Sequence, residues 1–160
     1  MENLEKHKKH NTYSKFVSML GLSFLAMYVT MYLNTYAIDH VYFSLTRFYM
    51  TCLGIATMAV IMLLVMLRMY TNKKKNIAIV VGSFILFSSA LFLVRTQSPI
   101  VGDVLWMKAM IPHHSIAILT SERADIKDPE VRKLADDIIK AQKKEIEEMK
   151  MMIKRLENDK

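Results

Sequence analysis

The segment MKAMIPHHSIAI, residues 107–118, carries side chains that can bind a metal ion. Met107 and Met110 precede the adjacent histidines His113 and His114. Thioether sulfur is a soft, neutral ligand that favours Cu(I), whereas imidazole binds copper and zinc alike. These ligand types predict a copper site with a preference for Cu(I), and leave Cu(II) or Zn(II) as alternatives.

Helical spacing divides these four side chains between two surfaces. Met107, Met110 and His114 fall within about 60° of one another, whereas His113 points about 100° away from His114. We therefore expect the two histidines to face different neighbours. The alternative is structural, because methionines at helical spacing commonly fill gaps in a core.

Pro112 interrupts the same helical pattern. A proline inside a helix costs roughly 3 kcal/mol and removes one backbone hydrogen bond. Two interpretations remain open. The residue stores strain at a functional site, or it marks the true start of the helix, with residues 101–111 as a separate segment.

The C-terminal residues predict a helical hairpin. One helix is expected over residues 101–124 and the next from Pro129 to about residue 156, with the turn between them. Asp128 is a suitable cap, and a proline at the first helical position loses no hydrogen bond. Apolar residues recur every three to four positions in the second helix, and Lys and Glu fill its other face.

Folding this hairpin at its turn predicts what lies opposite the candidate ligands. His114 is expected near residues 140–142, and Met107 near residues 147–149. Gln142 and Glu145 would then be polar side chains beside an apolar seam, which is costly unless they are paired or coordinate an ion.

Two amphipathic helices alone leave one apolar side uncovered. A second copy would complete a four-helix bundle, so we expect a homo-oligomer.

The first half of the chain predicts membrane helices. Its apolar segments lack internal charge and can each cross a hydrocarbon core of about 30 Å. The first is longer than the core of a usual signal peptide and no A-x-A site follows it, so we expect it to be retained. The three segments are residues 16–33, 48–67 and 76–94.

Basic residues predict the orientation of these segments. Lysines concentrate in residues 1–15 and in the 68–75 loop, whereas the other flanks offer only Arg47 and Arg95. The positive-inside rule puts the lysine-rich sides in the cytosol. We therefore expect a multi-pass protein of the bacterial inner membrane, with its C-terminal domain periplasmic or extracellular. The expected parts are a disordered cytosolic tail (1–15), a three-helix membrane region (16–95) and an extracytoplasmic hairpin domain (96–160).

Charge and cysteine content exclude other classes. The net charge of +7 gathers beside the apolar segments, so it indicates membrane topology and no nucleic-acid partner. Cys52 is the single cysteine, which excludes an intrachain disulfide and a cysteine-rich metal site. In the outer loop, Asp39 and His40 are expected to be exposed; the alternative is that they extend an external site.

The segments MKAMIPHH (107–114) and DPEVRKLADDIIKAQKKEIEEMK (128–150) resemble the bacterial family catalogued as domain of unknown function 305. The resemblance implies a ferritin-like all-α bundle, and some members are extracytoplasmic copper-binding proteins tied to copper resistance. The three-span half resembles a membrane-anchored subgroup. Thr120 departs from the pattern, because members often carry methionine there. The implied ligands are Met107, Met110, His113, His114 and Met149, with Gln142 and Glu145 as polar partners.

These features favour a membrane-anchored protein that buffers copper or exchanges it with a donor or acceptor protein. The alternative is a structural hairpin that docks a partner without metal. We expect no enzyme, because the chain lacks both the Glu-x-x-His pattern of di-iron bundles and a Ser/His/Asp or Cys/His set.

Overall fold

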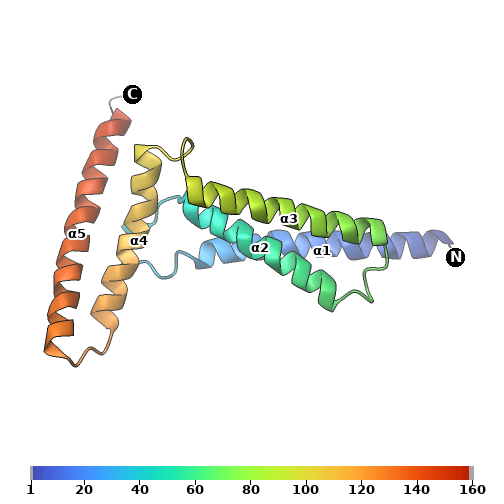
Figure 1. The fold of residues 1–160 in the computed structure, drawn as a ribbon, viewed down its shortest axis with the longest axis horizontal. Helices are drawn as coiled ribbons and strands as arrows, with labels where there is room; N and C mark the ends of the chain where they lie inside the picture. Colours follow the sequence, from blue (N-terminus) through green and yellow to red (C-terminus); the bar gives the residue numbers. More distant parts are fainter. Residues whose placement is uncertain (1, 159–160) are drawn as a thin grey trace. The chain divides into compact units, whose positions relative to one another are not determined.

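The computed structural model describes residues 2–158, and side chains over residues 12–158. These residues form five α-helices and one short 3₁₀ helix, η1, with no β-strand among them, which confirms the expected all-α class (Figure 1). The chain divides into two compact units, one of residues up to 29 with 47–97, the other of residues 30–46 with 98 onward. The elements are α1 (Glu2–Thr30), η1 (Ile38–His40), α2 (Leu45–Val65), α3 (Lys73–Thr96), α4 (Asp103–Arg123) and α5 (Pro129–Asn158).

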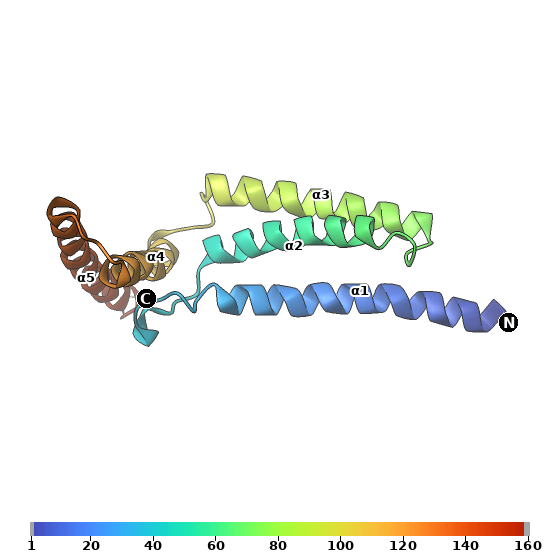
Figure 2. The same cartoon turned by 90° about the horizontal axis from the view of Figure 1, so that it is seen from below.

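In the first unit, α1, α2 and α3 run side by side (Figures 1 and 2). An apolar cluster joins Phe16 of α1 to Leu63 of α2. Beside it, the hydroxyl of Tyr13 donates to Oδ1 of Asn76 (2.7 Å) and accepts from the backbone N–H of Asn72 (3.0 Å). The N-terminal half of α1 is thereby bound to the end of the α2–α3 loop and to the first turn of α3.

The far end of α1 packs on the start of α2. The rings of Phe24 and Phe48 meet edge to face, with centroids 5.5 Å apart. Since Tyr13 lies at the other end of α2, α1 is antiparallel to α2 and extends along its whole length.

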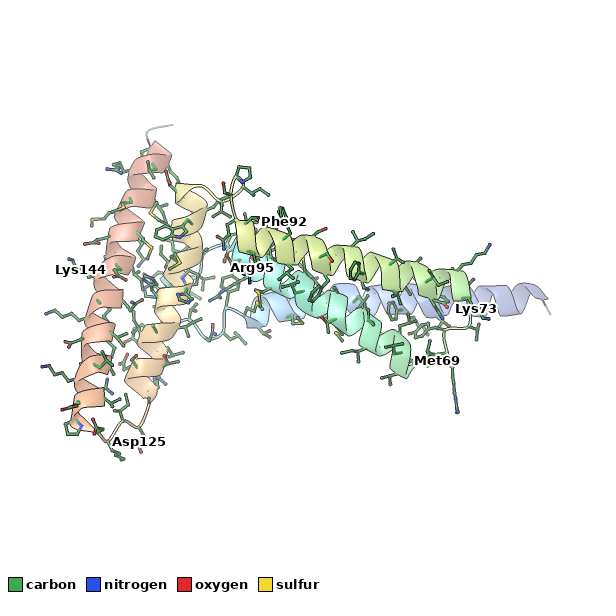
Figure 3. The ribbon with its side chains drawn as sticks, viewed as in Figure 1. Met69, Lys73, Phe92, Arg95, Asp125 and Lys144 are labelled. Carbon is green, nitrogen blue, oxygen red and sulfur yellow. The ribbon has the colours of Figure 1, made fainter. Side chains whose placement is uncertain are left out.

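Two helices, α2 and α3, are long and apolar enough to cross a membrane, among the residues described. The sequence predicts three such segments. The first predicted segment does not qualify because α1 ends at Thr30 and Met31 to Leu33 lie in a turn. The apolar part of the helix is therefore shorter than predicted, and it contains hydroxyl side chains. On α3, Phe84 is 71% exposed, as a lipid-facing side chain would be. Figure 3 shows Lys73 and Arg95 at opposite ends of this helix.

The predicted disordered tail is wrong for residues 2–15, which form the first part of α1. This stretch contains neither proline nor glycine, and it carries four lysines and two glutamates, which are good helix formers. It also continues directly into the apolar part of the helix, so no separate nucleation step is needed.

In the second unit, α4 and α5 form the expected antiparallel hairpin, with Asp125 at its turn (Figure 3). Ile111 and Ile118 of α4 are fully buried against Ile146 of α5. This seam of branched apolar side chains removes the facing sides of both helices from water, and burial of one such side chain contributes about 1.5–3 kcal/mol.

The predicted cap of α5 is confirmed. Oδ1 of Asp128 accepts the backbone N–H groups of Glu130 and Val131, each at 2.9 Å, and Pro129 is the first helical residue. The cap satisfies two donors that the helix itself leaves without partners.

Pro112 lies inside α4 and is fully buried. The interpretation that it starts the helix is therefore wrong. The start lies one residue after Gly102, where Asp103 places a carboxylate in the first turn, at the positive end of the helix dipole. The buried ring adds apolar packing that offsets part of the backbone cost.

Candidate metal centre

All three predicted thioether ligands gather in one apolar cluster between α4 and α5. Met107 and Met149 are core members, 4% and 7% exposed, and Met110 is half-buried against the same cluster. Their sulfur atoms are therefore largely shielded from water. This placement suits Cu(I), and it equally suits methionine as a filler of the core.

His114 of α4 is half-buried beside Glu145 of α5. Its Nδ1 lies 3.1 Å from Oε2 of Glu145, but the direction is wrong for a ring N–H to donate, so this buried nitrogen makes no hydrogen bond. The Nε2 amide of Gln142 approaches the same carboxylate oxygen at 3.5 Å, which is a weak contact. A polar ring nitrogen thus lies out of water without a hydrogen bond, which is costly for an imidazole that binds nothing.

The surroundings of His114 favour its neutral form. Burial lowers the pKa of this imidazole, the nearby carboxylate of Glu145 acts in the opposite direction, and His113 lowers it further. A neutral imidazole keeps one ring nitrogen with a free lone pair, which is the form that binds a metal.

The two adjacent histidines are separated, as the helical spacing predicts. His113 is exposed, and its ring centre lies 6.0 Å from that of His114. The five ligands that the resemblance implies are therefore not all brought together. His113 does not share the seam with the three methionines.

The register of the hairpin differs from the prediction. His114 meets Glu145, three residues beyond the expected Gln142. Side chains on a helix lean toward its N-terminus, so in an antiparallel pair the residues that touch have higher numbers than the backbone positions that face each other. Folding the sequence symmetrically at the turn ignores this lean.

Thr120 takes the place of a methionine in the family pattern. Its side chain is exposed, and its hydroxyl donates to the backbone carbonyl of Ile116 at 2.9 Å. A side chain at this position thus points away from the methionine cluster.

A second polar cluster lies one residue beyond His114. Ser115 is fully buried, and its Oγ accepts the backbone N–H of Tyr36 at 2.7 Å and lies 3.0 Å from Nδ1 of His40. Oδ2 of Asp39 pairs with Nζ of Lys150 on α5 at 2.6 Å. Residues 30–46 are therefore a third component of the second unit, docked on both helices of the hairpin.

The prediction that His40 is an exposed loop residue is wrong, since it is buried at 8% exposure. Burial lowers the pKa of His40; Asp39 and Glu147 act against this and Lys150 adds to it. Asp39 is exposed, and the hydrogen bond from Lys150 lowers the pKa of its carboxyl. One signal was available in the sequence: the loop contains Tyr42, which packs on the apolar cluster of the hairpin.

The two polar clusters occupy opposite flanks of the helical seam. Successive residues on a helix differ by about 100°, so Met110 and His114 share one flank of α4 and Ser115 turns to the other. On α5, Glu145 and Lys150 are five residues apart and therefore point to different sides of the helix, about 140° from each other. The loop therefore covers one flank, and the candidate ligands lie along the other.

Among the described residues, no group of three or more His, Cys, Asp or Glu side chains gathers as metal ligands would. A metal site on this flank would therefore combine thioethers with His114.

The fold and the clusters define a protein with three long helices in one unit and a helical hairpin with a docked loop in the other. Residues 101–160 match the sequence model of the family described as Domain of unknown function (DUF305). The chain is 32% identical over 143 residues to "Uncharacterized protein L153" of Acanthamoeba polyphaga mimivirus. The aligned region covers 85% of this chain and 91% of that protein. The chain belongs to the same family as this viral protein and carries the DUF305 domain at its C-terminal end. No solved structure matches it.

Proposed function

We propose that this protein is a membrane-anchored copper-binding protein, with its hairpin domain outside the cytosol. It would buffer copper or exchange it with a donor or acceptor protein, and it would catalyse no reaction. The observation that carries the proposal is the buried Nδ1 of His114, which makes no hydrogen bond and lies beside a cluster of thioethers.

The ligand geometry supports this proposal. Met110 and His114 are four residues apart on α4, and Glu145 and Met149 are four apart on α5, so each pair shares one face of its helix. The 3.1 Å approach of His114 to Glu145 joins the two pairs across the seam. Thioether and neutral imidazole ligands together favour Cu(I) over hard divalent ions.

The packing of the first unit supports three membrane crossings. Tyr13 contacts Asn72, and Phe24 contacts Phe48. These contacts lie near the two ends of α2, so α1 runs antiparallel to α2 along its whole length. If α2 crosses a bilayer, α1 crosses it as well, although its composition is less apolar. An odd number of crossings puts the N-terminus and the hairpin domain on opposite sides.

The division into units supports the same topology. The loop before α2 and the domain after α3 belong to one compact unit, so both must lie on one side of any membrane. The lysine-rich 68–75 loop then lies on the other side with the N-terminus, where the positive-inside rule places the cytosol.

Copper titration of the full chain in detergent tests the metal site. His114→Ala should weaken Cu(I) binding at least tenfold, since removing one direct ligand costs more than about 1.4 kcal/mol. The neighbouring His113→Ala is the matched control and should change the affinity little. Wild-type affinity weaker than micromolar, or equal losses in both variants, would contradict the proposed site.

Cysteine labelling tests the topology. In a Cys52→Ser background, Lys127→Cys in the hairpin turn and Thr71→Cys in the α2–α3 loop can be treated with a membrane-impermeant maleimide on intact cells. Only the Lys127→Cys protein should react before lysis. Labelling of Thr71→Cys alone would invert the orientation, and labelling of both or neither would contradict a membrane between them.

An exposed apolar stripe on α5 favours self-association. Val131, Leu134 and Met152 are exposed at positions that follow the helical repeat. We propose that a second copy covers this stripe, as the two-helix hairpin alone cannot. Leu134→Glu should then reduce the mass measured in detergent to that of one chain.

The same stripe favours a second candidate function, a hairpin that docks a partner protein without metal. Leu134→Glu would abolish partner binding in that case, and the His114→Ala protein would bind the partner as the wild type does. Copper binding that is lost with the ligand variants would decide for the first candidate.

A further inference from the structure

A pocket on the loop-covered flank of the hairpin has both an apolar wall and a basic rim. Its volume is about 530 Å³, within the usual range of ligand sites (about 300–1,000 Å³). Apolar side chains of the docked loop, Val41 and Phe43, form one wall, and both are exposed. Met151 and Ile153 of α5 extend this apolar surface.

The rim carries three lysines and two glutamates, and Asp39 of the docked loop also pairs with one of these lysines, Lys150. Nζ of Lys108 pairs with Oε1 of Glu157 at 2.6 Å, and Nζ of Lys150 bonds Oε1 of Glu147 at 3.0 Å. Lys154 makes no ion pair with any residue that the structure describes. The ammonium group of Lys154 is therefore available to an incoming anion.

The wall of this pocket is held in place by the loop contacts. The pair between Asp39 and Lys150 and the approach of His40 to Ser115 fix the residues immediately before Val41. After Phe43, only Ser44 separates the wall from Leu45, the first residue of α2. The wall of the pocket is thus one residue away in sequence from α2, a helix that is long and apolar enough to cross a membrane.

We propose that this pocket binds the headgroup of an anionic phospholipid, with the phosphodiester at Lys154 and the glycerol and first acyl carbons against Val41 and Phe43. One phosphodiester carries one negative charge, which would pair with the one lysine of the rim that has no ion pair among the described residues. The apolar wall suits a ligand that is part hydrocarbon, which inorganic phosphate is not. The inference depends on the membrane anchoring proposed above, but not on copper binding.

Native mass spectrometry of the full chain, released from nanodiscs of mixed phosphatidylglycerol and phosphatidylcholine, tests the pocket. The wild type should retain phosphatidylglycerol in preference to phosphatidylcholine. Lys154→Gln should reduce that retention about fivefold, roughly the contribution of one basic residue at an anionic surface. Lys140→Gln, at an exposed lysine elsewhere on α5, is the matched control and should retain the lipid as the wild type does.

A second variant gives a change of opposite sign. Glu157→Gln removes the carboxylate that pairs with Lys108, so retention of the anionic lipid should rise. Equal retention of the two lipids, or equal loss in Lys154→Gln and Lys140→Gln, would overturn the lipid site. Displacement of the lipid by millimolar inorganic phosphate would make the pocket a site for a free anion and would overturn it as well. A chain that fails to enter nanodiscs would contradict the membrane anchoring itself, while copper titration in solution would still report on the metal site.

Discussion

Nδ1 of His40 lies 3.0 Å from Oγ of Ser115, a residue 75 positions later in the chain. Ser115 Oγ also accepts the backbone N–H of Tyr36, so its own proton is available to donate to a neutral His40. The buried hydroxyl of Ser115, which follows His114 in sequence, thereby holds the loop between α1 and α2 on the hairpin.

Acid should release this loop. Burial lowers the pKa of His40, so its contribution to stability is complete above the unfolded-state pKa of about 6.5 and is lost as the pH falls through and below that value. Asp39, whose pKa is also lowered, loses its pairing with Lys150 only at still lower pH. Hydrogen exchange of the Tyr36 amide, corrected for intrinsic rates, should show protection at pH 7.5 that declines at pH 5.5. In His40→Gln this decline should disappear; if it persists, another group is responsible.

Ser115→Ala should loosen the same loop at neutral pH. The substitution leaves the Tyr36 N–H and the His40 ring without their shared partner, at a cost of about 1–3 kcal/mol. Exchange of the Tyr36 amide should accelerate accordingly. Ser121→Ala on the same helix is the control, because the Ser121 contact to Arg132 is made by the backbone carbonyl. Comparable acceleration in both variants would point to a general loss of helix stability.

Asp128→Ala should destabilise α5 from its start. Its carboxylate satisfies two backbone donors, and loss of such a cap costs about 0.5–2 kcal/mol. Asp125→Ala is the control, because Asp125 makes only an exposed pair with Lys127 and should change stability little. Thermal unfolding followed by circular dichroism measures the difference. An equal effect of the two substitutions would argue against the cap.

Ile118→Ala should be the most destabilising of these changes. The side chain is fully buried in the hairpin seam, and truncation of a buried isoleucine costs about 2–5 kcal/mol. Val131→Ala at an exposed position on α5 should cost far less in a monomer. Denaturant unfolding of both variants, at a concentration where the chain is monomeric, checks the contrast. A small loss for Ile118→Ala would mean that the seam repacks.

The sequence by itself determined the helical class and the hairpin with its cap. Asp128 and Pro129 act through local backbone geometry, and the apolar stripe of α5 follows a fixed period, so both are visible in a short window. The methionine and histidine spacing likewise separated His113 from His114, because that separation depends only on the rotation between adjacent residues.

Only the tertiary structure decided which distant residues meet. The pairing of His114 with Glu145 depends on how side chains lean in an antiparallel pair, and the burial of His40 depends on Ser115, far away in the chain. The continuity of α4 through Pro112 depends on the packing of the whole helix, which outweighs one lost hydrogen bond. Local preferences are short-ranged, whereas these contacts arise only after the helices have packed.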